Sequence, residues 1–381
     1  MHNLKEKLFN KPSKHLTETE RLLNFIQEYT NGKNVTIKTK MNENNELECL
    51  FVQTDYMRDW YHNYGHLTHI DATYCVMVEN FLLFHSLCQN ENLNGVPVAY
   101  CFMRSETKEN LEFYYEKLNS EVSKNSQIVM VDKDLSNISL ISKFFVNVII
   151  LICSFHVAKY FKTQIRKDEM EVPNNKKSLL YDILSKCIYT NDLSKYEDYK
   201  NQIKEISINF YDYFIKNWDN CKEMWMHYYR TELPIRATHT NNHIESFNRK
   251  LKRRLKRTMH FSECFKELML TTDEHYQQIV NKTKYRNKTN TTNYNDDWLN
   301  DMKDELNSKC MEFIKEENIL LKSGDVNYKI VDLSYGCYNI VNTKTSKAKS
   351  MSIENFKFKC DCEFYSHFEA PCRQLFQNIN N

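Results

Sequence analysis

Residues 127–155 read QIVMVDKDLSNISLISKFFVNVIILICSF, and this stretch decides the fold. It begins with an apolar run that ends at Asp132, continues with a segment of helical spacing and closes with a second apolar run. Short apolar runs on either side of a helix are typical of buried strands in a sheet that is covered on both faces. The stretch therefore predicts a strand, a helix and a second strand of an α/β fold.

Three strand-like segments lie upstream of this unit: LTHIDATYCVMVEN (67–80), FLLFHSLCQN (81–90) and GVPVAYCFMRS (95–105). Polar breaks separate them, as in an antiparallel meander. The segment KENLEFYYEKLNSEV (108–122) reads as a helix. The resulting order, β-β-β-α-β-α-β, predicts a mixed sheet with helices on both faces. Further upstream, residues 17–30 have helical spacing, with Thr17 as the cap.

The pattern becomes helical downstream of the second apolar run. Between residues 157 and 233 there is no glycine and a single proline, and aromatic residues recur at helical intervals. These features predict an all-helical insertion over about 157–238 with a core of its own. A further helix starts near Asn242. Residues 281–296 read as a polar linker, residues 297–322 as a helix, and the rest as a small β-rich tail.

The bulk composition limits what the chain can be. Its 381 residues, 27% charged and 41% hydrophobic, suffice for two or three globular domains. Lys and Arg total 52 against 50 for Asp and Glu, so any nucleic-acid surface must be local. No apolar run reaches the roughly 20 residues of a membrane span, and we expect no membrane partner. The 13 cysteines stand mostly alone in apolar surroundings, which indicates buried thiols in a reducing compartment.

Three acidic residues are candidates for catalysis. Asp71 lies within an apolar strand, where a carboxylate is costly unless a cation or donors meet it. Asp132 ends a strand at its carboxyl tip, where ligands of open α/β sheets bind. Glu245 lies on the helix that begins near Asn242, beside a core stripe of Ile244, Phe247, Leu251 and Leu255. Such a set suits two Mg²⁺ or Mn²⁺ ions in phosphoryl transfer.

Each of these residues also has a plainer interpretation. An aspartate at a strand end commonly serves as a cap or turn residue, and Asp134 competes with Asp132, although it suits a helix N-cap better. Glu245 taken alone fits an i,i+4 partner of Arg249. The combination of all three, in this order of elements, favours a metal site.

The same helix continues into RKLKRRLKR (249–257). A charge run of this kind is usually a solvated face. Because it follows Glu245 on one helix, we favour contact with the DNA backbone. The seven candidate residues are Arg249, Lys250, Lys252, Arg253, Arg254, Lys256 and Arg257.

Five motifs, taken in order, resemble the Mutator-like element transposases, especially relatives that end in a SWIM zinc finger. They are IDATYCV (70–76), GVPVAYCFMRSETKENLEFYYEKL (95–118), VDKDLSNI (131–138), the Cys153/His156 pair in CSFHVAKYF (153–161) and TNNHIESFNRKLK (240–252). The resemblance implies an RNase H-like fold interrupted by a helical insertion. It also implies that Asp71, Asp132 and Glu245 are a DDE triad for Mg²⁺-dependent DNA cleavage and strand transfer.

The C-terminal segment KFKCDCEFYSHFEAPCRQLF (357–376) resembles a SWIM finger, whose pattern is Cys-x-Cys followed by Cys-x-His. Cys360, Cys362 and Cys372 match, and Gln374 stands where the pattern has histidine. Either zinc is bound weakly, or His367 substitutes as the fourth ligand, or the finger is degenerate. Cys153 and His156 match the family's Cys-x-x-His, which we interpret as a structural pair near the site.

These features together predict four parts: residues 1–50 as a lead-in of helix and strand, 51–280 as the RNase H-like domain with its insertion, 281–324 as linker and helix, and 325–381 as the SWIM-like region. We expect a transposase-derived nuclear protein with DNA as its partner, and a homo-oligomer stays open. The alternative is a non-enzymatic, host-adopted protein that binds DNA or regulatory partners, which the altered finger favours. A plain RNase H-type nuclease is disfavoured because it has no use for the insertion.

Overall fold

The structure is a computed structural model of the 381-residue chain. It describes residues 17–73, 77–121, 126–236, 238–240, 242–288, 308–323, 328–334, 337–343, 345–354, 357–368, 372 and 374. The chain divides into two compact units, one of residues 1–150 with 241–283 and the other of residues 151–240 with 284–381. Within the described part of the chain, no helix is both long and apolar enough to cross a membrane.

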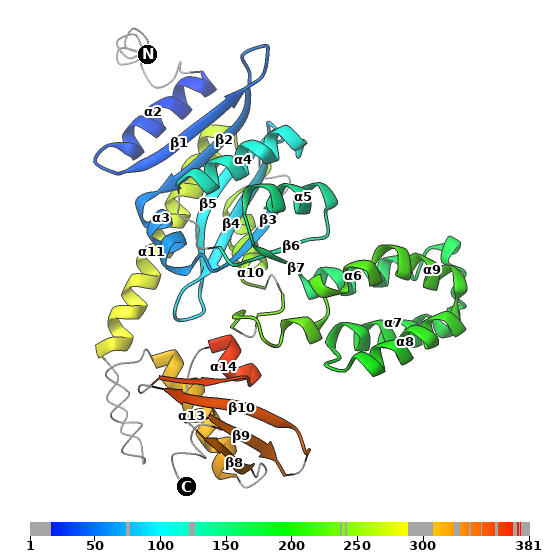
Figure 1. Ribbon diagram of the computed structural model, residues 1–381. Coiled ribbons are helices and arrows are strands. Elements are labelled where there is room, and N and C mark those ends of the chain that lie inside the picture. The colour runs from blue at the N-terminus through cyan, green and yellow to red at the C-terminus, as the bar shows by residue number, and fades with distance from the viewer. Residues whose placement is uncertain are drawn as a thin grey trace. The chain divides into compact units, whose positions relative to one another are not determined.

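A seven-stranded mixed sheet, in the order β1-β2-β5-β4-β3-β6-β7, forms the core of the first unit (Figure 1). Its neighbours from β1 to β3 pair antiparallel, and β3 pairs parallel with β6. The predicted order of three strands, helix, strand, helix, strand is confirmed, and residues 35–54 add β1 and β2 to the same sheet. The strands are β1 Val35–Met41, β2 Leu47–Thr54, β3 Leu67–Thr73, β4 Leu82–Gln89, β5 Gly95–Met103, β6 Ile128–Val131 and β7 Ile149–Ile152.

Helices cover both faces of this sheet, as predicted. One face carries α3 (Asp55–Tyr64), α4 (Lys108–Glu121) and α5 (Leu135–Phe144), and the other carries α2 (Glu18–Thr30), α10 (Asn242–Arg254) and α11 (Phe261–Lys288). Successive strand residues alternate between the two cores, because side chains alternate across a strand. Phe84 therefore packs edge-to-face on Tyr114 of α4, whereas Leu83 lies in the core with α10. Thr17 caps α2 in a capping box with Glu20, as its position predicted.

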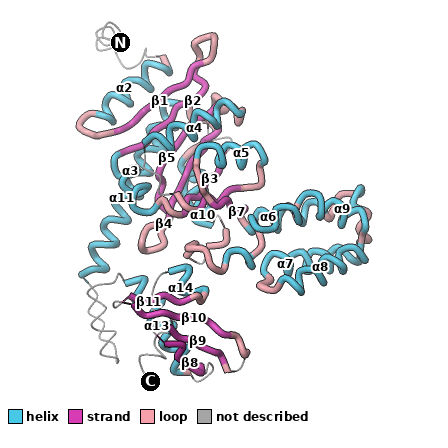
Figure 2. The backbone as a smooth tube through the Cα atoms, in the orientation of Figure 1, coloured by secondary structure: helices cyan, strands magenta, loops and turns pink. Residues whose placement is uncertain are grey.

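The segment after β7 is helical, and it builds a core of its own. It contains α6 (Ser154–Gln164), α7 (Lys177–Tyr189), α8 (Leu193–Ile206), α9 (Ile208–Asn217) and short 3-10 turns (Figure 2). Phe161, Trp218 and Trp225 pack edge-to-face at its centre and are fully buried or nearly so. The aromatic spacing seen in the sequence thus corresponds to a packed core.

The C-terminal part holds α13 (Ser308–Lys322), a four-stranded antiparallel sheet and α14 (Glu363–Phe368). The strands are β8 Tyr328–Ser334, β9 Cys337–Asn342, β10 Ala348–Glu354 and β11 Lys357–Cys360. One prediction was wrong: residues 281–288, read as linker, continue α11 because NKTKYRNK contains no glycine or proline to end a helix. The rest of that linker, and residues 297–307 of the predicted helix, lie outside the described residues.

Helix α10 is anchored by the four residues that its periodicity predicted. Ile244, Phe247, Leu251 and Leu255 are all buried in the core that α10 shares with the sheet and α11. The intervening positions are charged or polar, so a single face of the helix supplies its burial.

We therefore expect Leu251→Ala to destabilise the protein by about 2–5 kcal/mol, because a fully buried leucine would leave a cavity. The neighbouring Lys252 is exposed, and Lys252→Ala should cost less than about 0.5 kcal/mol. Urea unfolding followed by circular dichroism compares the two variants. Equal midpoints for both would show that the α10 stripe does not hold the helix.

Candidate functional site

Asp71 lies on β3, half-buried, on the sheet face that α10 covers. The antiparallel register sets it directly opposite His85 of β4. The side-chain amide of Asn248 on α10 donates a hydrogen bond to Oδ2 of Asp71 over 2.9 Å. The donor that a carboxylate in an apolar strand requires is thus supplied in part by a helix that is distant in sequence.

Asp132 follows the last residue of β6, at the carboxyl end of that strand. The parallel register pairs Leu67 with Ile128 and His69 with Met130. Extending this register by two residues brings Asp71 opposite Asp132, and adjacent strands lie about 4.8 Å apart. The two aspartates therefore occupy neighbouring positions near the carboxyl ends of β3 and β6.

The competing Asp134 has a different role. Its Oδ1 accepts a hydrogen bond from the backbone N–H of Asn137 over 2.9 Å, and it is the N-cap of α5. The interpretation of Asp134 as a helix N-cap is confirmed. Asp132 lies two residues earlier, directly after the last residue of β6.

Glu245 occupies the first turn of α10, three residues before Asn248. Its side chain lies outside what the structure describes. The helix is nevertheless held against β3, because Asn248 donates a hydrogen bond to Asp71 and the neighbouring Phe247 is buried. Positions three apart lie on the same side of a helix.

His85 is a residue of this site that the sequence analysis missed. It is fully buried between Tyr100 and Phe247, with ring centroids 6.2 Å from each. Burial lowers the pKa of His85 to about 3, although a side-chain hydrogen bond with Asn248 acts in the opposite direction and raises it. A neutral imidazole therefore lies across from Asp71. The signal was a histidine in an otherwise apolar strand, but its register with β3 could not be fixed from the sequence.

The basic run 249–257 is only partly helical and only partly exposed. Helix α10 ends at Arg254, whose guanidinium pairs with Glu267 over 3.1 Å and with Glu274 over 2.6 Å. Lys250 Nζ lies 3.2 Å from Nδ1 of His275. These two cations are therefore engaged with α11. The other five candidate residues, Arg249, Lys252, Arg253, Lys256 and Arg257, are exposed.

A cavity of about 610 Å³ adjoins this basic surface. Arg249, Lys250 and Arg253 line it from α10, together with His275 and the turn at Asn94 and Gly95. His275 donates from Nε2 to the carbonyl oxygen of Gly95 over 2.9 Å, so its Nδ1 faces Lys250 as an acceptor. The cavity is thus lined by cations along α10.

Cys153 and His156 lie where β7 gives way to α6, with Cys153 fully buried. Among the described residues, neither belongs to a group of three or more metal-ligating side chains with ligand atoms within 4.8 Å of one another. The buried side chain at this junction is instead Arg230. It donates to Oγ of Ser154, to the carbonyl of His239 and to the carbonyl of Met224 over 2.9–3.0 Å, and also to the carbonyl of Ile152.

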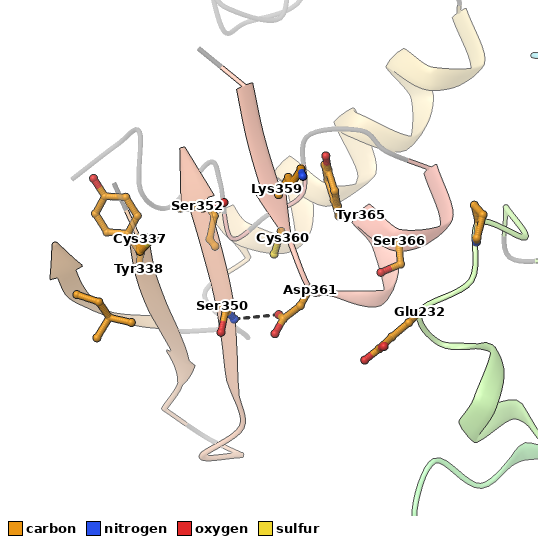
Figure 3. Close-up of a pocket in the computed structure, with 13 residues that line it drawn as sticks. Glu232, Cys337, Tyr338, Ser350, Ser352, Lys359, Cys360, Asp361, Tyr365 and Ser366 are labelled. Carbon is orange, nitrogen blue, oxygen red and sulfur yellow. Dashed lines mark hydrogen bonds between the residues drawn. The ribbon is translucent and has the colours of Figure 1, made fainter. Parts of the chain in front are cut away.

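The three C-terminal cysteines do come together. The sulfurs of Cys360, Cys362 and Cys372 lie within 4.8 Å of one another and all three residues are buried. Hydrogen bonds from the other two thiols lower the pKa of Cys360 to about 4. Figure 3 shows Cys360 at the end of β11, where the carboxylate of Asp361 accepts a 2.9 Å hydrogen bond from the Ser350 backbone N–H. The arrangement fits a thiolate metal site.

His367 is not part of this group of sulfurs. Its Nε2 lies 3.3 Å from the carbonyl oxygen of Arg230, and its ring is 5.9 Å from that of His239. Gln374 stands two residues after Cys372 in the sequence and is buried. Its Nε2 donates a hydrogen bond to Oη of Tyr328 over 3.4 Å. The amide oxygen of Gln374 has no hydrogen-bond partner among the described residues. That oxygen is therefore a candidate ligand atom for a metal at the cysteines.

Two comparisons with protein families agree with this architecture. Residues 24–151 match the RNase H-like domain of zinc finger SWIM domain-containing proteins 1 and 3. Residues 98–279 match the Mutator family of transposases. No curated protein matches the chain. The two matched regions overlap over residues 98–151, which hold β6 and most of β5 and β7, and together they include Asp71, Asp132 and α10. Over residues 24–279 the chain is thus similar to the Mutator family of transposases and to the RNase H-like domain of SWIM domain-containing proteins, as its motifs indicated.

Proposed function

We propose that this protein cleaves DNA phosphodiester bonds and transfers DNA strands, with Asp71, Asp132 and Glu245 as its metal-binding carboxylates. The observation that carries the proposal is the 2.9 Å hydrogen bond from Asn248 to Asp71. It ties the helix of Glu245 to the strand of Asp71, next to the register position of Asp132. Three carboxylate-bearing positions from two strands and a helix then share one edge of the sheet.

The residues present fit a magnesium or manganese centre. Both aspartates supply the hard oxygen donors that such ions prefer, Asp71 from β3 and Asp132 from the carboxyl end of the adjacent strand β6. Bound there, the ions would lower the barrier to attack on a phosphodiester by supporting the attacking and leaving oxygens. Asn248 orients one oxygen of Asp71, and the apolar layer of Phe247 and Tyr100 shields the neutral His85 beneath it.

DNA would lie along the exposed cations of α10 and the segment that follows it. Arg249, Lys252 and Arg253 are exposed on the helix that also holds Glu245, so backbone contacts there would bring a phosphate toward the carboxylates. Contacts of this kind position the duplex without reading its sequence. A DNA substrate in turn implies the nucleus as the place of action.

A second candidate function is a non-enzymatic DNA-binding or regulatory role. The observation that favours it is Gln374 at the fourth finger position, since an altered finger fits a protein adopted for another use. The same basic surface would serve both functions. Only cleavage separates them.

The catalytic proposal predicts that Asp71→Asn and Asp132→Asn each abolish Mg²⁺- or Mn²⁺-dependent cleavage, because an amide keeps the shape but loses the charge that holds the ion. Asp134→Asn is the matched control: asparagine also caps helices, so cleavage should stay near the wild-type rate. Strand scission of terminal-repeat DNA is the measurement. A wild-type protein that binds DNA but cleaves with neither metal would give the role to the non-enzymatic candidate.

For the DNA surface, Arg253→Gln with Arg257→Gln should weaken binding to all sequences. Two lost phosphate contacts should reduce the slope of log affinity against log salt by about 2. The control replaces Lys108 and Lys143 by glutamine, since both are exposed on helices of the opposite sheet face. A double arginine variant with the slope of this control would mean that the run is a solvated face.

We also propose that Cys360, Cys362 and Cys372 bind zinc, with the Gln374 oxygen or water as the fourth ligand. Cys372→Ser should then lose this zinc, about one ion per chain, because it removes one of three converging thiolates. His367→Ala should keep it, since His367 faces the Arg230 carbonyl. Zinc per chain is measured by elemental analysis. Zinc lost with His367→Ala but kept with Cys372→Ser would contradict this assignment.

A further inference from the structure

A second group of metal-ligating side chains lies apart from the cysteines, within the same compact unit. His227, His239 and Glu363 each offer one ligand atom, and these atoms all lie within 4.8 Å of one another. The three residues come from separate stretches of the chain. His227 begins a 3-10 turn, His227–Arg230, His239 lies shortly before α10, and Glu363 is the first residue of α14.

The three side chains converge closely. Nε2 of His227 is 3.3 Å from Oε1 of Glu363. The rings of His227 and His239 have centroids only 4.1 Å apart, with their planes at 61°. Two basic rings and a carboxylate in such a small volume form the donor set of a cation site.

The backbone at His239 accepts two hydrogen bonds. Its carbonyl oxygen accepts from the Ser154 N–H over 3.1 Å and from Nη1 of Arg230 over 3.0 Å. Nδ1 of His239 is buried and has no hydrogen-bond partner among the described residues. A buried polar nitrogen without a partner is costly and requires an explanation.

We propose that His227, His239 and Glu363 bind a divalent transition-metal ion of the zinc class. Imidazole nitrogens suit zinc and its neighbours, whereas magnesium and calcium prefer an all-oxygen set. Three protein ligands leave a fourth tetrahedral position for water. Glu363 is partly exposed, so the ion can reach the site from solvent.

This ion would join the end of the helical insertion to the C-terminal element. Glu363 directly follows Cys362, so one short helix would contribute to two metal centres with different donors. His367 of the same helix stays outside both, because its Nε2 faces the carbonyl oxygen of Arg230. The His/Glu centre and the cysteine centre can therefore be removed separately.

The test measures zinc bound by the full-length protein in excess Mg²⁺, which occupies oxygen-only sites. Glu363→Gln and His227→Gln should each bind about one zinc per chain less than the wild type. His62→Gln, an exposed histidine on α3, is the control and should bind as much as the wild type. Wild-type zinc content in both Glu363→Gln and His227→Gln would overturn the proposal and leave an ion pair between His227 and Glu363.

A second measurement does not depend on the folding of those variants. In a chain with Cys360, Cys362 and Cys372 replaced by serine, Co²⁺ should still bind with visible d–d absorption and without thiolate-to-cobalt charge transfer. Adding Glu363→Gln to this chain should weaken Co²⁺ binding at least tenfold. Absence of Co²⁺ absorption from the folded serine variant would also overturn the proposal.

Discussion

The buried guanidinium of Arg230 is the constraint on which the route of the chain depends. The chain leaves the sheet at Ile152 and comes back toward α10 at His239, and Arg230 donates hydrogen bonds to the carbonyl oxygens of both. Its two other acceptors, Ser154 and Met224, belong to the start and the end of the insertion. Burial lowers the pKa of Arg230 to about 10, so it remains charged at neutral pH. A buried charge is tolerated because these oxygens replace water.

Closing the insertion in this way is what allows a helix far along the chain to complete a site on the sheet. The entropy cost of closing a loop rises only slowly with loop length. A long insertion is therefore tolerated when its two ends are held together. The apolar stripe then seats α10 through Phe247 and Leu251, and Asn248 bonds to Asp71. The stripe supplies apolar burial, which is not directional, whereas the hydrogen bond from the Asn248 side-chain amide to Asp71 fixes which residues meet. The site therefore depends on both a nonspecific and a specific interaction.

The sequence predicted those features that depend on local pattern. Strand–helix–strand order, the Thr17 cap and the α10 stripe follow from periodicity and capping, which involve neighbouring residues only. Features that depend on distant pairs could not be predicted. The His85–Asp71 pairing requires the β3–β4 register, and the engagement of Arg254 with Glu267 and Glu274 requires the packing of α10 on α11. The basic run therefore looked uniform in sequence although two of its cations, Lys250 and Arg254, are engaged with side chains of α11.

The C-terminal cysteine motif shows why a pattern alone did not identify which side chains converge. His367 was available by sequence distance, yet α14 begins at Glu363, and the Cys362 sulfur accepts from the Tyr365 N–H over 3.4 Å as an N-cap would. Once this helix forms, Cys362 lies with Cys360 while Glu363 and His367 lie toward His239. The short helix thus separates thiolate donors from the imidazole and carboxylate donors. The C-terminal cysteine segment is therefore tied, through Glu363 and His367, to the segment that Arg230 holds in place.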